Sequence, residues 1–133
     1  AIAQNEVIDG AGNGDGLNVL RPLAQLRFLD LAANEIHNLQ SLRDLTTLET
    51  LVLFECLIED IQPLAGLVNL RELQLSSNGI VDISVLADLE QLDLITLQMN
   101  QITSITPLVR NQGLDTNDVL RLIIELEQSC NAT

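Results

Sequence analysis

The sequence predicts an α/β solenoid, in which short parallel strands alternate with compact return segments. Three observations predict this fold. Of the 133 residues, 28 are leucine and 12 are isoleucine, whereas only 2 are aromatic. The leucines recur with a period of 22 residues, and each period contains a Leu-x-Leu pair (Ile-x-Leu in the fourth), the alternation of a strand that buries one face. A period of 22 residues is too short for a strand and a full crossover helix, so each period must form one coil of a stack.

The composition excludes several classes of protein. The chain carries 19 acidic and 6 basic residues, for a formal net charge of -13. Nucleic-acid binding needs a basic surface, and an intrinsically disordered chain has a lower apolar content. The longest apolar runs are far shorter than the roughly 20 residues that a membrane-spanning helix needs. We therefore expect one folded domain, with no nucleic-acid partner and no membrane insertion.

Four repeats of 22 residues fill residues 19–106 without a gap. Eight positions of each repeat are occupied consistently, seven of them by leucine or isoleucine. In the first repeat these eight positions are Leu20, Leu23, Leu26, Leu29, Leu31, Asn34, Ile36 and Leu39. No single coil can bury its leucines, but stacked coils share one core, with neighbouring strands ~4.8 Å apart.

Residues 1–18 are expected to form an N-terminal flank or cap, in which residues 9–16 are rich in glycine and acids. If Asp9 is position 1 of an EF-hand loop, Ala11 and Leu20 fall at positions 3 and 12, where oxygen ligands are needed. The run also resembles one calcium-binding nonapeptide repeat, which has no neighbouring copy to share its ligands. A turn-rich loop is the preferred interpretation, and a calcium site is the alternative.

Residues 107–133 are expected to form an irregular fifth repeat and a C-terminal cap. In the preferred interpretation, residues 118–123 add a fifth strand with Leu120 and Leu122 pointing inward, followed by a short tail. The alternative is a helix with a possible cap at Asp115 or Thr116, because apolar residues also recur at helical spacing. These residues are Val119, Leu122, Ile123 and Leu126. Either element would cover the last coil.

Residues 19–108 resemble the leucine-rich repeat family, whose pattern is Leu-x-x-Leu-x-x-Leu-x-x-Leu-x-Leu-x-x-Asn-x-Ile-x-x-Ile. The Ile-x-Asp-Ile endings at 58–61 and 80–83 resemble the 22-residue class of bacterial internalins. The resemblance implies a right-handed solenoid, with the sheet on the concave face and 3-10 or extended returns on the convex face. It also implies a non-catalytic module that binds a protein, in preference to a glycan, through the concave face. Secretion or display at the cell surface is implied as well, with a cytoplasmic location as the alternative.

The same resemblance assigns a structural ladder to the asparagine position, where side chains bind backbone groups of adjacent turns. This position holds Asn34, Cys56, Asn78 and Asn100. Cys56 is expected to point inward as a small buried group with weak donor capacity. Cys130 should lie about three coils away, beyond the ~7 Å Cα separation that a disulfide allows, so two free thiols are predicted.

Residues with catalytic chemistry are scarce. The single histidine, His37, follows the predicted strand, where a solvated loop residue is favoured over a base or a metal ligand. Glu59 and Asp60 fall in a turn, where acidic residues are common. Ser76 and Ser77 have no histidine in register with them. We therefore expect no enzymatic activity, no metal site and no cofactor.

The outward positions of the predicted sheet form the candidate binding surface. Both phenylalanines, Phe28 and Phe54, fall at such positions and not at leucine positions. With Val52 they are expected to form an apolar patch, which Leu94 and Met99 extend. The alternative is that these are isolated exposed residues without a binding role. The complete candidate surface is Phe28, Asp30, Val52, Phe54, Glu55, Glu72, Gln74, Leu94, Thr96, Gln98 and Met99.

A second function stays open on sequence grounds. The chain could be a segment of an array that associates end to end, or a spacer within a larger bacterial surface protein. Open solenoid ends expose strand edges unless a cap covers them, so self-association is a possible outcome. The acidic balance favours a partner of basic or neutral character.

Overall fold

The computed structural model describes residue 23 and residues 25–131, except for the side chains at positions 123, 124 and 127–131. Within this part of the chain, four strands form one parallel sheet, in which the strand order follows the sequence. The strands are β1 (Phe28–Asp30), β2 (Thr50–Val52), β3 (Glu72–Gln74) and β4 (Leu94–Thr96). Paired residues are 22 positions apart, as Leu29 and Leu51 are. This register confirms the predicted repeat.

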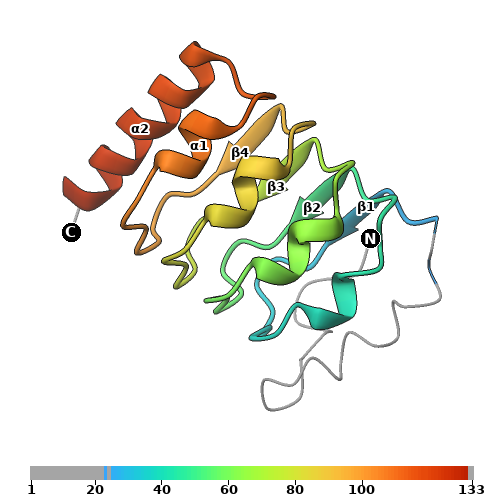
Figure 1. The fold of residues 1–133 in the computed structure, drawn as a ribbon. Helices are drawn as coiled ribbons and strands as arrows, with labels where there is room; N and C mark the ends of the chain where they lie inside the picture. Colours follow the sequence, from blue (N-terminus) through green and yellow to red (C-terminus); the bar gives the residue numbers. More distant parts are fainter. Residues whose placement is uncertain (1–22, 24, 132–133) are drawn as a thin grey trace.

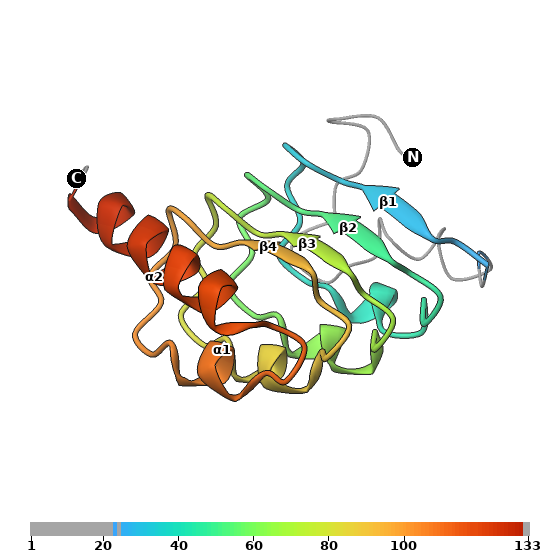
Figure 2. The same cartoon turned by 90° about the horizontal axis from the view of Figure 1, so that it is seen from above.

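The return segments contain short 3-10 helices, and two α-helices follow the last strand. These elements are η2 (Gln40–Leu42), η3 (Gln62–Gly66), η4 (Ser84–Asp88), α1 (Thr106–Arg110) and α2 (Thr116–Asn131). The strands lie along one side of the stack and the 3-10 helices along the other, while α2 lies at the C-terminal end (Figures 1 and 2). The predicted solenoid, with its sheet on the concave face, is therefore confirmed.

The leucines of successive coils form one continuous core. The central strand residues Leu29, Leu51 and Leu73 are buried, and so are Ile61 and Ile83, which close the second and third repeats. Each coil contributes the same apolar positions, so neighbouring coils share every buried surface. Removal of one such leucine would leave a cavity that destabilises both adjoining coils.

Each return begins with the same hydrogen-bonded turn, in which a side chain bonds to the backbone two residues later. A side-chain oxygen accepts from the backbone N–H two residues later, at the first residue of the following helix, with distances from 2.8 to 3.3 Å. The residues that supply this oxygen are Asn38, Asp60, Asp82 and Ser104. Short polar side chains of this kind satisfy N–H groups that have no partner within the helix. The pKa of Asp82 is held below its ordinary value by its hydrogen bonds with Ser84.

The turn after each strand has a left-handed backbone. Four non-glycine residues at the same repeat position have φ between 56° and 59°. They are Ala33, Glu55, Ser77 and Met99. This conformation reverses the chain before the ladder position, and it is uncommon for residues that carry a Cβ. Its recurrence in four coils shows that packing of the repeat determines the turn.

The asparagine position forms a ladder of hydrogen bonds along the stack. The Asn78 amide nitrogen donates to the carbonyl oxygen of Leu53 in the preceding coil (2.8 Å), and Asn100 donates in the same way to Leu75 (2.9 Å). The Asn78 side-chain oxygen accepts from the backbone N–H of Ile58 (3.0 Å). The ladder thus satisfies buried backbone groups at the boundary between coils.

Cys56 occupies the ladder position of the second coil, and its thiol is buried. Its Sγ donates to the carbonyl oxygen of Leu31 (3.1 Å), the equivalent of the carbonyl groups that the asparagines bind. A thiol carries no oxygen acceptor, and the N–H of Ile36 donates instead to the Cys56 backbone carbonyl (3.0 Å). The next residue, Leu57, has a left-handed φ of 65°, which Glu35 and Gln101 at the same repeat position do not have.

The C-terminal segment is a helix, so the preferred prediction of a fifth strand at residues 118–123 is wrong. Asp115 precedes α2 and accepts a hydrogen bond from the backbone N–H of Asp118 (2.9 Å), as an N-cap does. Leu120, which was expected to point inward, is 52% exposed, whereas Leu122 is buried.

The physical reason for the helix lies in the repeat register. Asn117 occupies the position that holds leucine or isoleucine in the four preceding coils, as at Ile95. The fifth repeat therefore lacks an apolar residue for the inward centre of a strand. Val119, Leu122 and Leu126 instead lie on one face of α2 and pack against the core.

One buried side chain fastens the loop between α1 and α2 to the fourth coil. The Asn111 amide nitrogen donates to the carbonyl oxygens of Leu86 (2.6 Å) and Leu89 (3.0 Å), and its oxygen accepts from the N–H of Gly113 (2.8 Å). A Cβ at position 113 would collide with the backbone carbonyl of Glu90. This close approach of two backbone segments requires glycine.

Two expectations concern parts of the chain outside the described residues. They are the flank at residues 1–18, with its alternative calcium site, and the thiol of Cys130. Among the helices that the structure does describe, none combines the length and the apolar character needed to cross a lipid bilayer.

Candidate functional site

The sheet brings the candidate surface residues from four coils onto one face. Seven of them belong to the strands themselves, and the others follow β2 and β4. The parallel pairing places Phe28 beside Thr50, Thr50 beside Glu72, and Glu72 beside Leu94. These four side chains point to the same face, because residues that are paired in register on neighbouring strands have the same place in the alternation.

Large apolar side chains are exposed at the two ends of this face. Phe28 in β1 is 46% exposed, Leu94 in β4 is 42% exposed, and Met99, after β4, is 51% exposed. The two groups are separated by the width of the four-stranded sheet. The face therefore offers two apolar contact regions, one at each end.

The middle of the expected apolar patch is less exposed than the sequence suggested. Val52 is only 7% exposed, and Phe54 is half-buried. Val52 pairs with Asp30 in β1 and with Gln74 in β3, and these neighbours flank its short side chain. The expectation that Val52 is an exposed anchor is corrected here, because alternation gives the direction of a side chain but not its depth.

Polar and acidic side chains occupy the centre of the face. In the inner strand β3, the Gln74 amide nitrogen donates to the Glu72 carboxylate (2.7 Å). Beside Phe28 in the edge strand β1, the Asp30 carboxylate accepts from the backbone N–H of Ala32 (3.0 Å). Glu55 is exposed at the rim. The central surface is therefore hydrogen-bonding and negative in character.

Helix α2 reaches the same face beside β4. The Gln98 amide nitrogen donates to the Glu125 carboxylate (2.7 Å), so this candidate side chain is held by the helix. Thr96 Oγ1 is buried and has no hydrogen-bond partner in the described structure. The contribution of Glu125 was missed because its segment was expected to be a tail after a strand.

A column of alternating charge borders the sheet. Arg27 pairs with Glu49 (2.6 Å), and Arg71 pairs with Asp93 (2.7 Å), each pair linking two adjacent coils. The signal in the sequence is that these four residues share one repeat position and alternate in sign. Such exposed pairs contribute little to stability. Their effect is to place ordered charges beside the apolar side chains of the face.

The Cys56 thiol is unsuited to nucleophilic chemistry. Burial raises its pKa above the ordinary value of 9.0, and the backbone N–H groups of Asn34 and Ala33 offset only part of this rise. The thiolate is the reactive form, so a raised pKa keeps the group inert at neutral pH. Cys56 therefore has a structural part in the ladder.

His37 is exposed on the loop edge that follows the strands. It lines two depressions, one with Leu57 and Glu59 and the other with Asp60 and Pro63. Within the described residues, no group of three histidine, cysteine or acidic side chains is placed to hold a metal ion.

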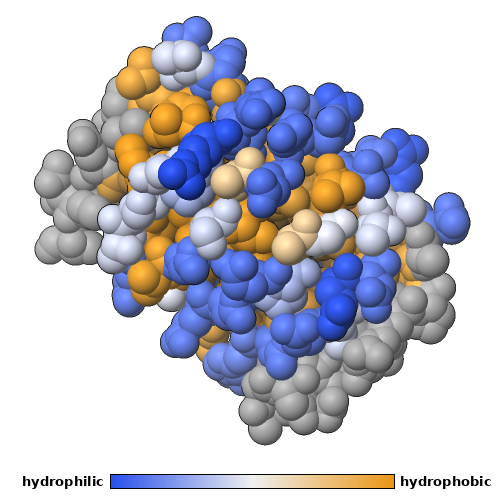
Figure 3. Space-filling view, viewed as in Figure 1, coloured by the Kyte–Doolittle hydropathy of each residue, from blue (hydrophilic) through white to orange (hydrophobic). Residues whose placement is uncertain are grey.

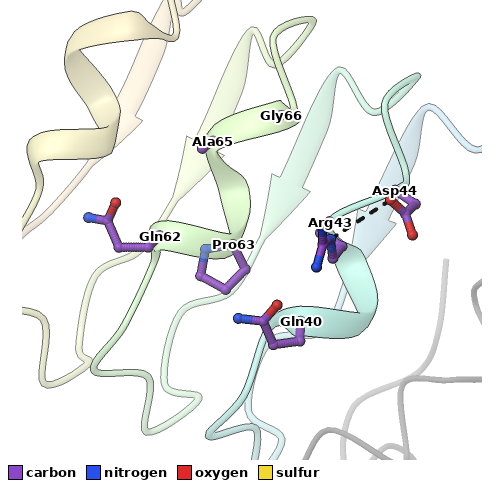
Figure 4. A pocket seen from close by; sticks show the side chains of 7 residues that line it. All are labelled: Gln40, Arg43, Asp44, Gln62, Pro63, Ala65 and Gly66. Atoms are coloured by element: carbon purple, nitrogen blue, oxygen red, sulfur yellow. Dashed lines mark ion pairs between the residues drawn. The ribbon is translucent and has the colours of Figure 1, made fainter.

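A further depression of about 340 Å³ lies on the convex side, between η2 and η3. Its lining residues are Gln40, Arg43, Asp44, Gln62, Pro63, Ala65 and Gly66. The amides of Gln40 and Gln62 point away from the Arg43–Asp44 pair, so the polar groups do not converge on one point (Figure 4). Polar residues dominate this side over the 3-10 helices, and apolar surface gathers over α1 and α2 (Figure 3).

The leucine-rich repeat family model, described as two copies of the repeat, matches the chain twice. The matches cover residues 24–66 and 68–110, which contain all four strands and the 3-10 helices. No curated protein sequence matches the chain.

Two solved structures from Listeria monocytogenes are similar to the chain. An internalin C2 is 32% identical, with a TM-score of 0.72 over 80% of this chain and 52% of that one. An internalin (inlF) is 28% identical, with a TM-score of 0.61 over 71% of this chain and 35% of that one. The chain thus spans about half of the first structure and about a third of the second. The resemblance to the internalin class of repeats is confirmed.

Proposed function

We propose a function from one premise: the chain belongs to the leucine-rich repeat family, whose model matches residues 24–66 and 68–110. The chain acts as a non-catalytic recognition module that binds a protein partner through the concave face of its sheet. The observation that carries this proposal is the exposure of Phe28, Leu94 and Met99 on that face. Large apolar side chains surrounded by polar groups are typical of the anchors of protein interfaces.

The charges of the face support a partner of basic or neutral character. Asp30, Glu55 and Glu72 lie between or beside the apolar ends, and the whole chain has a formal net charge of -13. Opposite charge on the partner would accelerate association and select against acidic competitors. A glycan is the less favoured ligand, because sugars stack on aromatic rings and Phe28 is the one well-exposed ring of the face. We further expect the module to act in secreted form or at the cell surface, as the internalin resemblance implies.

The separation of the apolar ends defines the size of the partner surface. Phe28 and Leu94 are three strand spacings apart, or about 14 Å at ~4.8 Å per strand. A partner that contacts both ends must cover the acidic centre as well. Such a footprint suits a folded domain or an extended segment that crosses all four strands.

Two matched triple variants test the proposal. One removes the concave apolar side chains, and the other removes equally exposed apolar side chains elsewhere. The sets are Phe28→Ala/Leu94→Ala/Met99→Ala and Val68→Ala/Val109→Ala/Leu120→Ala. Each protein is immobilised and used to capture secreted and surface proteins of the source organism, followed by calorimetric titration with the purified partner. Each interface anchor contributes on the order of 2 kcal/mol, so the concave variant should bind at least 100-fold more weakly than wild type.

The second variant controls for nonspecific adsorption, and it should bind as wild type does. Both variants should keep the wild-type melting temperature, because all six side chains are exposed. Equal binding by the concave variant and wild type, or a loss confined to the second variant, would refute the proposal.

A further inference from the structure

The loop edge that follows the strands carries a cavity of about 370 Å³, whose lining shares no residue with the concave candidate surface. We propose that this cavity, the loop-edge notch, binds a lysine or arginine side chain of the protein partner. Its lining residues are His37, Leu57, Glu59, Ser77, Asn78 and Gly79. The inference rests on the proposed function, because it specifies the chemistry of a partner protein.

One wall of the notch is an exposed aliphatic side chain. Leu57 is 54% exposed and has a left-handed φ of 65°. This backbone conformation costs about 1–2 kcal/mol for a residue with a Cβ. The side chain is therefore largely exposed, in a backbone conformation that accompanies the Cys56 ladder contact. In the notch it offers an apolar surface to the stem of a ligand side chain.

The floor of the notch is open because residue 79 is glycine. A Cβ at Gly79 would lie 3.3 Å from Cγ of Glu59, a tight contact that would narrow the space between the second and third coils. The backbone of Gly79 is not in the left-handed region, so its conformation does not demand glycine. Glu35, Leu57 and Gln101 carry side chains at the same repeat position. The absence of a side chain at Gly79 thus creates room at this coil boundary.

The charge of the notch selects the ligand. Glu59 is exposed, and within the described residues its carboxylate makes no hydrogen bond or ion pair. A purely aliphatic ligand would cover this carboxylate without pairing it, and an acidic ligand would be repelled. Lysine and arginine carry an aliphatic stem that can pack on Leu57 and a cation that can pair with Glu59.

The test uses small probes and the full chain labelled with nitrogen-15. The probes are the Nα-acetyl N-methylamides of lysine and arginine, with the norleucine derivative as a neutral analogue of the same stem length. We expect saturable shift changes in proton–nitrogen spectra, concentrated at the amides of Leu57, Glu59 and Gly79. Dissociation constants should be in the millimolar range for the cationic probes and at least threefold weaker for the neutral one. Changes spread evenly over all acidic loops would overturn the proposal.

Variants give the second arm of the test. Glu59→Gln should weaken binding of the lysine probe at least threefold, and Gly79→Ala should weaken it as well, because the added methyl group presses on Cγ of Glu59 and shifts its carboxylate. Glu90→Gln removes the same charge at another exposed position and should bind the probe as wild type does. Melting temperatures establish that each variant is folded. A Glu59→Gln variant with wild-type affinity would overturn the proposal.

The concave triple variant separates this inference from the proposed function. Its substitutions lie outside the notch, so it should bind the lysine probe with wild-type affinity even though it no longer captures the partner. If wild type bound no lysine probe while the concave triple variant still lost the partner, the notch proposal alone would be refuted. If the lysine probe bound at the notch but the concave triple variant captured the partner as wild type does, the proposed role of the concave face alone would be refuted.

Discussion

At the scale of single residues, Cys56 shows how one side chain determines the backbone of its neighbour. An asparagine in the ladder presents both a donor and an acceptor, as Asn78 does, whereas a thiol can donate but carries no oxygen. The missing acceptor is replaced by the Cys56 backbone carbonyl, which bonds to Ile36. The reoriented backbone then passes through a left-handed conformation at Leu57. The repeat pattern predicts that Cys56 points inward, but it does not predict the left-handed backbone at Leu57.

Leu57→Gly is expected to stabilise the fold. Glycine adopts a φ of 65° without a steric penalty, whereas leucine pays about 1–2 kcal/mol. The larger conformational entropy of glycine in the unfolded chain offsets part of this gain. The free energy of unfolding in urea should therefore rise by about 0.5–1 kcal/mol. The same variant should lose the lysine-probe binding that is proposed for the loop-edge notch.

Leu57→Ala is the matched control for that substitution. Alanine removes the same exposed side chain but keeps a Cβ in the left-handed conformation, so the unfolding free energy should not increase. If glycine and alanine gave equal stability, the strain assigned to Leu57 would be absent.

At the scale of elements, the cap formed by α1 and α2 depends on a close approach of two backbones. Asn111 holds the loop between these helices against the fourth coil through the carbonyl groups of Leu86 and Leu89. Gly113 lies against the backbone carbonyl of Glu90, where no side chain fits. The cap is thus positioned by polar contacts and close backbone packing, in addition to the apolar face of α2.

Gly113→Ala should therefore displace the cap. The added methyl group collides with a backbone carbonyl and not with a flexible side chain, so the loop must move. We expect a loss of about 2 kcal/mol in the free energy of unfolding. Hydrogen exchange should accelerate first at the amides of α2. Gly66→Ala is the control, because its Cβ would lie 3.5 Å from the carbonyl oxygen of Arg43, an ordinary contact. Equal effects of the two substitutions would contradict the assigned part of Gly113.

The strands could be predicted from the sequence, but the final helix could not. A Leu-x-Leu pair that recurs at a fixed spacing, such as Leu51 and Leu53, gives the strand one apolar face. The face that the strand buries and its pairing with the neighbouring strands can therefore be predicted. In the last segment, Leu122 has a buried position in either a strand or a helix, and spacing alone does not decide between them. The deciding features are the N-cap at Asp115 and the polar residue Asn117 at a leucine position.

The sequence predicts which face the candidate side chains point to, but not how deeply each side chain is buried. Alternation along the strands places Phe28 and Leu94 on the outward face, where both are exposed. The same rule places Val52 there, although neighbouring strands on both sides bury it. The notch at Gly79 was not predicted from the sequence, because a cavity between coils depends on side chains about 22 residues apart and on the conformation of the local turn.

At the scale of the whole molecule, the C-terminal end of the stack is covered. β4 is an edge strand of the described sheet, and the fifth repeat places α2 beside it in place of another strand. Leu122 on α2 is buried against the core, and Gln98 after β4 is bonded to Glu125. A covered end opposes the stacking of one copy on another.

The chain is therefore expected to remain monomeric. Multi-angle light scattering should give a constant mass of 14.6 kDa over two orders of magnitude in protein concentration. Leu122→Asp, which places a charge at the buried contact of α2, should undock the helix and increase association. Growth of the wild-type mass with concentration would instead favour the alternative function, an array that assembles end to end.

The constant register between coils has a consequence for the evolution of such modules. Because every coil pairs with its neighbours through residues 22 positions apart, one more copy of a coil could enter the middle of the stack without altering the existing pairs. The insertion would leave the interior chemistry unchanged and would move Phe28 away from Leu94 by ~4.8 Å. Duplication of a single unit would therefore adjust the reach of the module in fixed increments, so that lineages could match ligands of different length while retaining the same anchors.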